Sequence, residues 1–200
     1  MTVIRQDDLI ESVADALQFI SYYHPVDFIQ AINEAYEREE SPAAKDALAQ
    51  ILINSRMSAI GHRPMCQDTG IVTVFIKVGM NVSWEDATMS VSNMVNEGVR
   101  RAYTHPDNIL RASIVEDPDG ARLNTQNNTP AVIHFEIVEG ETVDVQVAAK
   151  GGGSENKSKL VMLNPSDSVV DWVVQTIPTM GAGWCPPCLL YTSPSPRDRG

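Results

Sequence analysis

The sequence is poor in cysteine, with three residues among 200. Three cysteines are too few for the disulfide framework of a small secreted protein. No apolar run approaches the roughly 20 residues that a membrane-spanning helix requires. The N-terminus, Met-Thr-Val-Ile-Arg-Gln-Asp-Asp, also lacks the basic and apolar regions of a signal peptide. These absences predict a reduced, cytoplasmic protein that does not enter the membrane.

Basic residues are also scarce. Fifteen Lys and Arg face 26 Asp and Glu, which gives a formal net charge of −11. A nucleic-acid partner is therefore not expected, because phosphate binding requires a clustered basic surface. An anionic substrate would need a local group of cations that acts against the overall field.

The first 61 residues show the periodicity of helices. Apolar residues at helical spacing predict one helix over residues 7–23 and a second that starts at Pro25. Ser41-Pro42 predicts the start of a third helix, which Gly61 would end. This region offers helical packing and no evident chemistry.

The following segment predicts a strand and then a further helix. Ile71–Val78 is rich in β-branched residues and is bounded by glycines, as is typical of a strand. Ser83 and Asp86 resemble a capping box, which would open a helix that runs to about Tyr103.

The last third of the chain predicts more strands. Residues 131–138 and 142–149 alternate apolar and polar side chains, which indicates a β-hairpin whose strands each have one buried face. Residues 167–177 predict a short helix. The fold class is therefore α+β, with an N-terminal helical region packed on a mixed, largely antiparallel β-sheet.

The turn before the first predicted strand gathers four reactive or polar side chains, those of Cys66, Gln67, Asp68 and Thr69. Loops held by rigid elements are common places for chemistry. Alternatively, Cys66 is a buried thiol that behaves as a small hydrophobe, and Asp68 closes an Asx-type turn. The polar neighbours of Cys66 argue against simple burial, since they require hydrogen-bond partners.

Two further segments could bind an anion. Arg111 is a cation on a short apolar segment inside the long polar stretch 104–130, and such long loops are usually functional or mobile. The glycines of Lys150–Ser158 could bring backbone N–H groups close to a ligand. That run matches neither the P-loop nor the dinucleotide pattern, and a flexible turn is the commoner explanation for it.

The pair Cys185 and Cys188 could indicate a redox motif or half a zinc site. Neither is favoured, because the pair does not open a helix in a βαβ unit and no second C-x-x-C exists. After Pro187 the composition shifts abruptly to Ser, Pro and Arg. We therefore expect one domain over residues 1–187 and a non-native tail over residues 188–200.

Taken together, four motifs resemble the class I, iron–sulfur fumarate hydratases and the sister L-tartrate dehydratase alpha subunits, from about residue 5 to Pro187. The motifs are Pro64–Gly70, Asn108–Ser113, Ala149–Lys157 and Gly183–Pro187. This resemblance implies a [4Fe–4S] hydro-lyase in which Cys66 and Cys185 hold irons of the cluster. The third cysteine ligand of the family lies beyond this chain, as do its C-terminal cationic ligands and catalytic base.

The resemblance also implies substrate-binding roles for Gln67, Asp68, Arg111 and Gly152. Asp68 would be catalytic, near the transferred hydroxyl. Arg111 would pair bidentately with a substrate carboxylate, and Gly152 would offer backbone N–H groups.

The implied reaction is the reversible hydration of fumarate to L-malate, with L-tartrate or another hydroxydicarboxylate as the alternative substrate. The intact enzyme is expected to be a homodimer. The chain as given, short of one ligand, is expected not to hold a stable cluster. A non-catalytic metal-binding module and a fragment without function are the remaining alternatives. A cluster with an open iron should bleach in air, whereas a structural metal should stay bound.

Overall fold

The computed structural model describes residues 2–66, 68–151 and 159–180. The chain divides into two compact units, Met1–Lys150 and Gly151–Gly200.

The first unit confirms the α+β class. Its three N-terminal helices begin and end within a few residues of the predicted positions, and the predicted strand at residue 71 is present. In chain order its elements are β1 (Thr2–Arg5), α1 (Gln6–Tyr22), α2 (Val26–Arg38), α3 (Pro42–Gly61), β2 (Ile71–Gly79), β3 (Val82–Glu85), α4 (Val91–Tyr103), β4 (Val115–Glu116), β5 (Leu123–Asn124), β6 (Val132–Val138) and β7 (Val143–Lys150).

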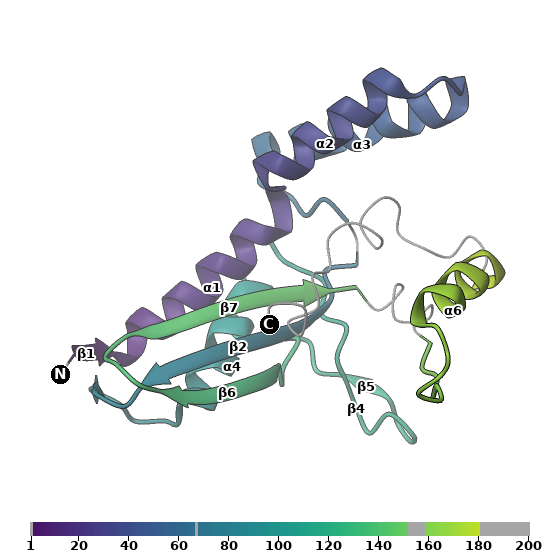
Figure 1. Ribbon diagram of the computed structural model, residues 1–200. Helices are drawn as coiled ribbons and strands as arrows, with labels where there is room; N and C mark the ends of the chain where they lie inside the picture. Colours follow the sequence, from purple (N-terminus) through teal and green to yellow (C-terminus); the bar gives the residue numbers. More distant parts are fainter. Residues whose placement is uncertain (1, 67, 152–158, 181–200) are drawn as a thin grey trace. The chain divides into compact units, whose positions relative to one another are not determined.

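The main sheet of this unit is mixed and has the order β6-β2-β7. Strand β2 runs parallel to β6 and antiparallel to β7. A parallel pair joins β1 to β3, and an antiparallel pair joins β4 to β5. Helices α1 and α4 lie together behind the main sheet in Figure 1, so they cover one of its faces.

The hydrophobic core lies between that face and the two helices. Strand β2 alternates buried and partly exposed residues, and its buried side chains pack against the apolar stripes of α1 and α4, as expected for a half-covered sheet. The core consists of Leu9, Ile10, Val13 and Leu17 of α1, Val72, Val74, Ile76 and Val78 of β2, Met94, Val95, Val99, Ala102 and Tyr103 of α4, and Leu110.

The predicted β-hairpin is wrong, because β2 lies between β6 and β7. The short link between the two strands crosses the end of β2, where Gly79 N–H donates to the Thr142 carbonyl at 2.9 Å. A Cβ at Gly79 would lie 2.6 Å from the Gly140 carbonyl oxygen, so this crossing requires glycine. An alternation of apolar and polar residues identifies a half-buried strand, but it does not show which strand pairs with it. Strand β6 is also more exposed than expected, with Phe135 at 48% and Ile137 at 67%.

The predicted capping box is also wrong. Residues Val82–Glu85 form β3, which pairs in parallel with β1 at the start of the chain. Asp86 then has a φ of 56°, a left-handed conformation that cannot belong to an α-helix. Helix α4 starts later, at Val91, and its N-cap is Ser90, whose hydroxyl accepts from the N–H of Asn93 at 3.2 Å.

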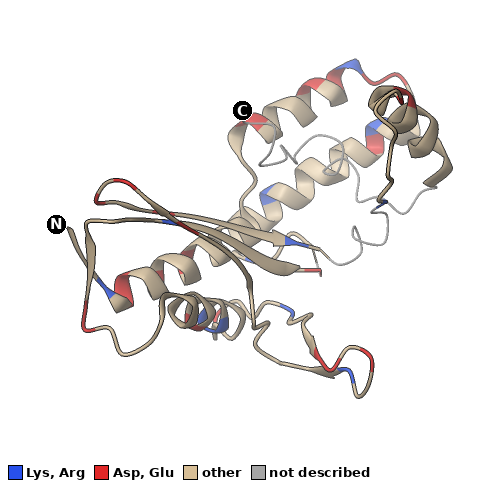
Figure 2. Ribbon diagram, turned by 60° about the horizontal axis from the view of Figure 1, so that its bottom comes forward, with Lys and Arg blue, Asp and Glu red and all other residues tan. Residues whose placement is uncertain are grey.

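The second unit contains α6 (Val169–Thr176) and the 3₁₀ helix η1 (Ile177–Met180). The predicted helix over residues 167–177 is therefore confirmed, although Val169, Val170 and Val174 are exposed. In the part of the chain that the structure describes, every helix is too short or too polar to cross a lipid bilayer. Figure 2 shows acidic residues on helices and turns throughout, with Lys and Arg scattered between them.

Candidate functional site

The turn that carries Cys66 is anchored to two helices. His62, with a φ of 46°, ends α3 in a left-handed conformation and turns the chain. Met65 then donates its N–H to the Ser21 carbonyl at 2.9 Å, and its own carbonyl accepts from the Asn54 side chain at 2.8 Å. Cys66 is half-buried, and its sulfur accepts the N–H of Asp68 at 3.4 Å. Such N–H donors stabilise a thiolate and tune a metal bound to it.

The exit of this turn lies against the end of β7. Gly70 has a φ of +87°, and a Cβ there would lie 2.7 Å from the backbone nitrogen of Lys150. The next residue, Ile71, is the register partner of Lys150 in the β2–β7 ladder. Lys150, which directly precedes the glycine run of the sequence, is therefore held beside the Cys66 turn.

Tyr103 supports the Cys66 turn from the buried side. It is 1% exposed at the end of α4, and its hydroxyl donates to the Thr69 carbonyl at 2.7 Å. Burial raises the pKa of Tyr103 to about 12, and the nearby Asp68 carboxylate adds to the increase. The phenol therefore stays protonated near neutral pH. Cys66, Asp68 and Tyr103 all line a cavity of about 180 Å³.

The Arg111 segment is fixed beside the same turn. Thr69 donates its hydroxyl to the Arg111 carbonyl at 2.6 Å. Upstream, the Asn108 side chain donates to Gln18 of α1 at 2.8 Å, and Leu110 is buried in the core. The Arg111 side chain is exposed, and no ion pair joins its guanidinium to another described residue. The backbone of Arg111 is therefore held by Thr69, whereas its guanidinium faces solvent.

Three of the predicted site residues, Cys66, Asp68 and Arg111, are thus brought together on adjoining segments. Gln67, Gly152 and Cys185 lie outside the described residues. Sequence reasoning missed Tyr103 and Asn128, which hold the segments in place. The only available signals were the position of Tyr103 at a helix end and the adjacent asparagines 127 and 128 ahead of a predicted strand.

The described residues do not form a complete metal site. Within residues 2–66, 68–151 and 159–180, no group of three or more His, Cys, Asp or Glu could hold a metal ion. Cys66 suits the role of one ligand, because its sulfur receives a backbone N–H and borders a cavity. An iron–sulfur cluster requires further thiolates, so the fit is that of one part of a ligand set.

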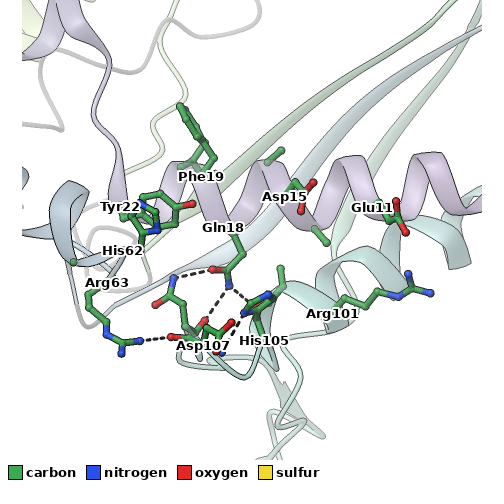
Figure 3. A pocket seen from close by; sticks show the side chains of 16 residues that line it. Glu11, Asp15, Gln18, Phe19, Tyr22, His62, Arg63, Arg101, His105 and Asp107 are labelled. Carbon is green, nitrogen blue, oxygen red and sulfur yellow. Dashed lines mark hydrogen bonds between the residues drawn. The ribbon is translucent and has the colours of Figure 1, made fainter.

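A larger cavity, of about 1030 Å³, lies between α1, residues 61–63 and the end of α4 (Figure 3). Acidic and basic side chains are mixed along it, and Gln18 reaches into its middle to donate to the carbonyls of Ala102 at 2.6 Å and Asn108 at 2.9 Å. Tyr22 and His62 stack at one end, with ring centroids 4.8 Å apart. None of the predicted site residues lines this cavity, so it is not the candidate site.

Tyr103→Phe is expected to lower the free energy of unfolding by about 1 kcal/mol at neutral pH, since it removes the buried hydroxyl that donates to the carbonyls of Thr69 and Gly70. The substitution should also change how the free energy of unfolding depends on pH above 10. The pKa of about 12 in the folded protein exceeds the ordinary tyrosine pKa of 10.0. The parent protein should therefore lose stability as pH rises from 10 to 12, because its unfolded state deprotonates first.

Denaturant unfolding at pH 7 and at several pH values above 10 measures both effects. Tyr23→Phe is the matched control, because the hydroxyl of Tyr23 has a single hydrogen-bond partner among the described residues, the ring of the exposed His62 at 3.4 Å. Equal alkaline slopes for the parent and Tyr103→Phe would contradict the buried position of this phenol.

Comparisons of the sequence with a family model and with individual known proteins point to the same family. Residues 10–191 match the fumarate hydratase (Fumerase) family. A Methanocaldococcus jannaschii protein assigned as an L(+)-tartrate dehydratase subunit alpha is 32% identical over 184 residues, which cover 89% of this chain and 64% of the relative. The L(+)-tartrate dehydratase subunit alpha of Escherichia coli strain UTI89 is 28% identical over 187 residues, covering 91% of this chain and 60% of the relative.

The anaerobic class I fumarate hydratase of Escherichia coli strain K12 is 31% identical over 157 residues, which cover 76% of this chain and 28% of the relative. The chain thus spans less than two thirds of the length of each of these relatives.

Proposed function

The chain belongs to the fumarate hydratase (Fumerase) family, and from this premise we propose that it is the N-terminal part of an iron–sulfur hydro-lyase acting on small dicarboxylates. The reaction is the reversible hydration of fumarate to L-malate. The observation that carries the proposal is the contact of Thr69 with the Arg111 carbonyl, because it sets a thiol, a carboxylate and a guanidinium on adjoining segments.

Cys66 and Cys185 are proposed to hold irons of a [4Fe–4S] cluster, together with a third cysteine from outside this chain. When bound, the cluster supplies a Lewis-acid iron that polarises the substrate hydroxyl and its adjacent carboxylate. The N–H of Asp68 stabilises the Cys66 thiolate.

The remaining steps belong to residues of this chain. Asp68 holds its carboxylate beside the cavity that Cys66 lines, where it orients the hydroxyl that is transferred. Arg111 presents two parallel N–H donors to one substrate carboxylate, a geometry that guanidinium provides and ammonium does not. The backbone N–H of Gly152 and the side chain of Gln67 bind the substrate next to the cluster.

The charge of the chain makes Arg111 important. With a formal net charge of −11, the protein repels a dianionic substrate at long range. A guanidinium without a described ion-pair partner offers the local cation that a dicarboxylate needs. The intact protein is proposed to be cytoplasmic and to act as an assembly, either a homodimer or a pair of different subunits.

L-tartrate, or another hydroxydicarboxylate, is the second candidate substrate. It is favoured by the relatives named as tartrate dehydratase subunits. L-malate and L-tartrate both carry a hydroxyl on the carbon next to a carboxylate, so the residues of this chain do not choose between them.

The test is an anaerobic assay of this chain, expressed with any coding sequence that adjoins it in its source. Fumarate, L-malate and L-tartrate are offered separately. We expect water addition to fumarate, and a brown cluster absorbance that bleaches in air. Activity on L-tartrate alone would reverse the order of the two candidates. A metal that stays bound in air without any hydro-lyase activity would identify a non-catalytic module instead.

A further inference from the structure

Asn128 is the most completely buried polar side chain of the described residues, with an exposed fraction of 0%. Its side-chain oxygen accepts the N–H groups of Ser113 at 2.7 Å and Ile114 at 3.3 Å. Its side-chain nitrogen donates to the Gly70 carbonyl at 2.9 Å. One amide therefore joins two backbone segments that lie far apart in the sequence.

The two joined segments are those that carry the candidate chemistry. Gly70 ends the turn that holds Cys66 and Asp68, and Ser113 lies two residues after Arg111. The hydroxyl of Thr69 also joins these two segments, because it donates to the Arg111 carbonyl at 2.6 Å. Asn128 adds a second link on the buried side, so the turn and the Arg111 segment are held at two points.

The requirements at this position are specific. Residue 128 has a φ of 61°, a left-handed conformation that asparagine tolerates better than most residues. Its side chain must accept on one side and donate on the other, which an amide does and a carboxylate or an alkyl group does not. A buried amide with both ends satisfied is rigid, since breaking either bond leaves a polar group without a partner.

We propose that Asn128 is a positioning residue that sets Arg111 relative to Cys66 and Asp68, and so fixes where a dicarboxylate lies with respect to the cluster ligand. The catalytic meaning of this alignment rests on the proposed function. The alignment of the Arg111 segment with the Cys66 turn does not rest on the proposed function, because it is a property of the folded polypeptide.

The test compares two variants of the chain that disconnect different halves of the link. Asn128→Leu removes both the acceptor and the donor. Asn128→Asp, studied at pH 8, keeps an acceptor for the N–H groups of Ser113 and Ile114 but removes the donor to Gly70. The matched control is Asn127→Ala, because among the described residues the Asn127 side chain bonds only Thr129 of its own loop, at 3.1 and 2.8 Å.

Two measurements follow the two halves separately. Hydrogen exchange reports the amides of Ser113 and Ile114, with Val74 of β2 as the reference for the core. The rate of alkylation of Cys66 by N-ethylmaleimide, resolved by peptide mass spectrometry, reports the accessibility of the turn, and Cys188 serves as the internal reference for the reagent.

For Asn128→Leu we expect the amides of Ser113 and Ile114 to exchange about tenfold faster, as loss of one hydrogen bond implies, and Cys66 to be alkylated faster than in the parent. For Asn128→Asp we expect faster alkylation of Cys66, with exchange at Ser113 and Ile114 within about twofold of the parent. Asn127→Ala should change neither.

A uniform increase in the exchange rates that includes the amide of Val74 would show a purely structural role and overturn the proposal. Unchanged alkylation of Cys66 in Asn128→Asp would overturn it as well. Neither measurement requires a cluster or a substrate. Failure of the hydro-lyase assay with this exchange pattern intact would therefore reject the proposed function and leave the positioning role standing.

Discussion

Replacing Gly98 by alanine is expected to lower the free energy of unfolding by about 2 kcal/mol, although alanine is the better helix former. Gly98 lies inside α4, where this helix packs against α1. A Cβ at this position would lie 2.7 Å from the Ile10 carbonyl oxygen and 2.8 Å from the Val13 Cβ. Both atoms are fixed to the α1 backbone, so the added methyl group can be accommodated only if the helices separate.

The two opposing effects can be compared. Alanine gains about 1 kcal/mol over glycine in a helix interior. Overpacking a well-packed core costs about 3 kcal/mol when backbone has to move. The net loss is therefore about 2 kcal/mol, which urea unfolding followed by circular dichroism would measure as a lower midpoint at an unchanged slope.

Gly61→Ala is the matched control, because Gly61 also belongs to a helix and the nearest atom to its new Cβ would be the Arg63 Cγ at 3.8 Å. It should be neutral or slightly stabilising. A Gly98→Ala variant as stable as the parent would contradict the close packing of α1 on α4, on which the position of Tyr103 and the candidate site depends.

Arg111→Lys is expected to lower kcat/KM about 100-fold in the proposed hydro-lyase reaction, equivalent to about 2.7 kcal/mol. The charge is kept, but the pair of parallel N–H donors to a substrate carboxylate is lost. The fold should be unaffected, since the Arg111 side chain is exposed and Thr69 contacts its backbone carbonyl, which lysine retains.

Steady-state kinetics on the anaerobically assembled protein, with unfolding curves alongside, separates the catalytic from the structural effect. Arg56→Lys is the control, because Arg56 is exposed on α3 and lines neither cavity. Retention of more than about a third of the parental kcat/KM by Arg111→Lys would exclude bidentate carboxylate binding at this position.

Local patterns in the sequence predicted most of the elements. Helical periodicity located α1, α2 and α3, and the β-branched run located β2. The two errors concern pairing between distant segments. The β6–β7 hairpin failed because β2 lies between its strands, and the capping box at Ser83 failed because β3 pairs with β1. Alternation and capping patterns report local exposure and hydrogen bonding, and they do not specify which distant strand completes a ladder.

The candidate site was predictable to a similar extent. Cys66, Asp68 and Arg111 carry distinctive functional groups in recognisable motifs, so the sequence pointed to them. The supporting residues do not stand out. Tyr103 bonds a carbonyl 34 residues away and Asn128 one that is 58 residues away. Their importance depends on contacts that exist only after folding, and a tyrosine at a helix end or an asparagine before a strand is ordinary in sequence.

The proposed function requires the thiols of Cys66 and Cys185 to hold the same cluster. Treatment of the native chain, with Cys188→Ser to remove the neighbouring thiol, by a short reagent that bridges two thiols tests this directly. At low protein concentration the account predicts a peptide that joins residues 66 and 185 as the main product, and its disappearance in urea. Ready single alkylation of both cysteines with no bridged peptide in the native protein would contradict the account.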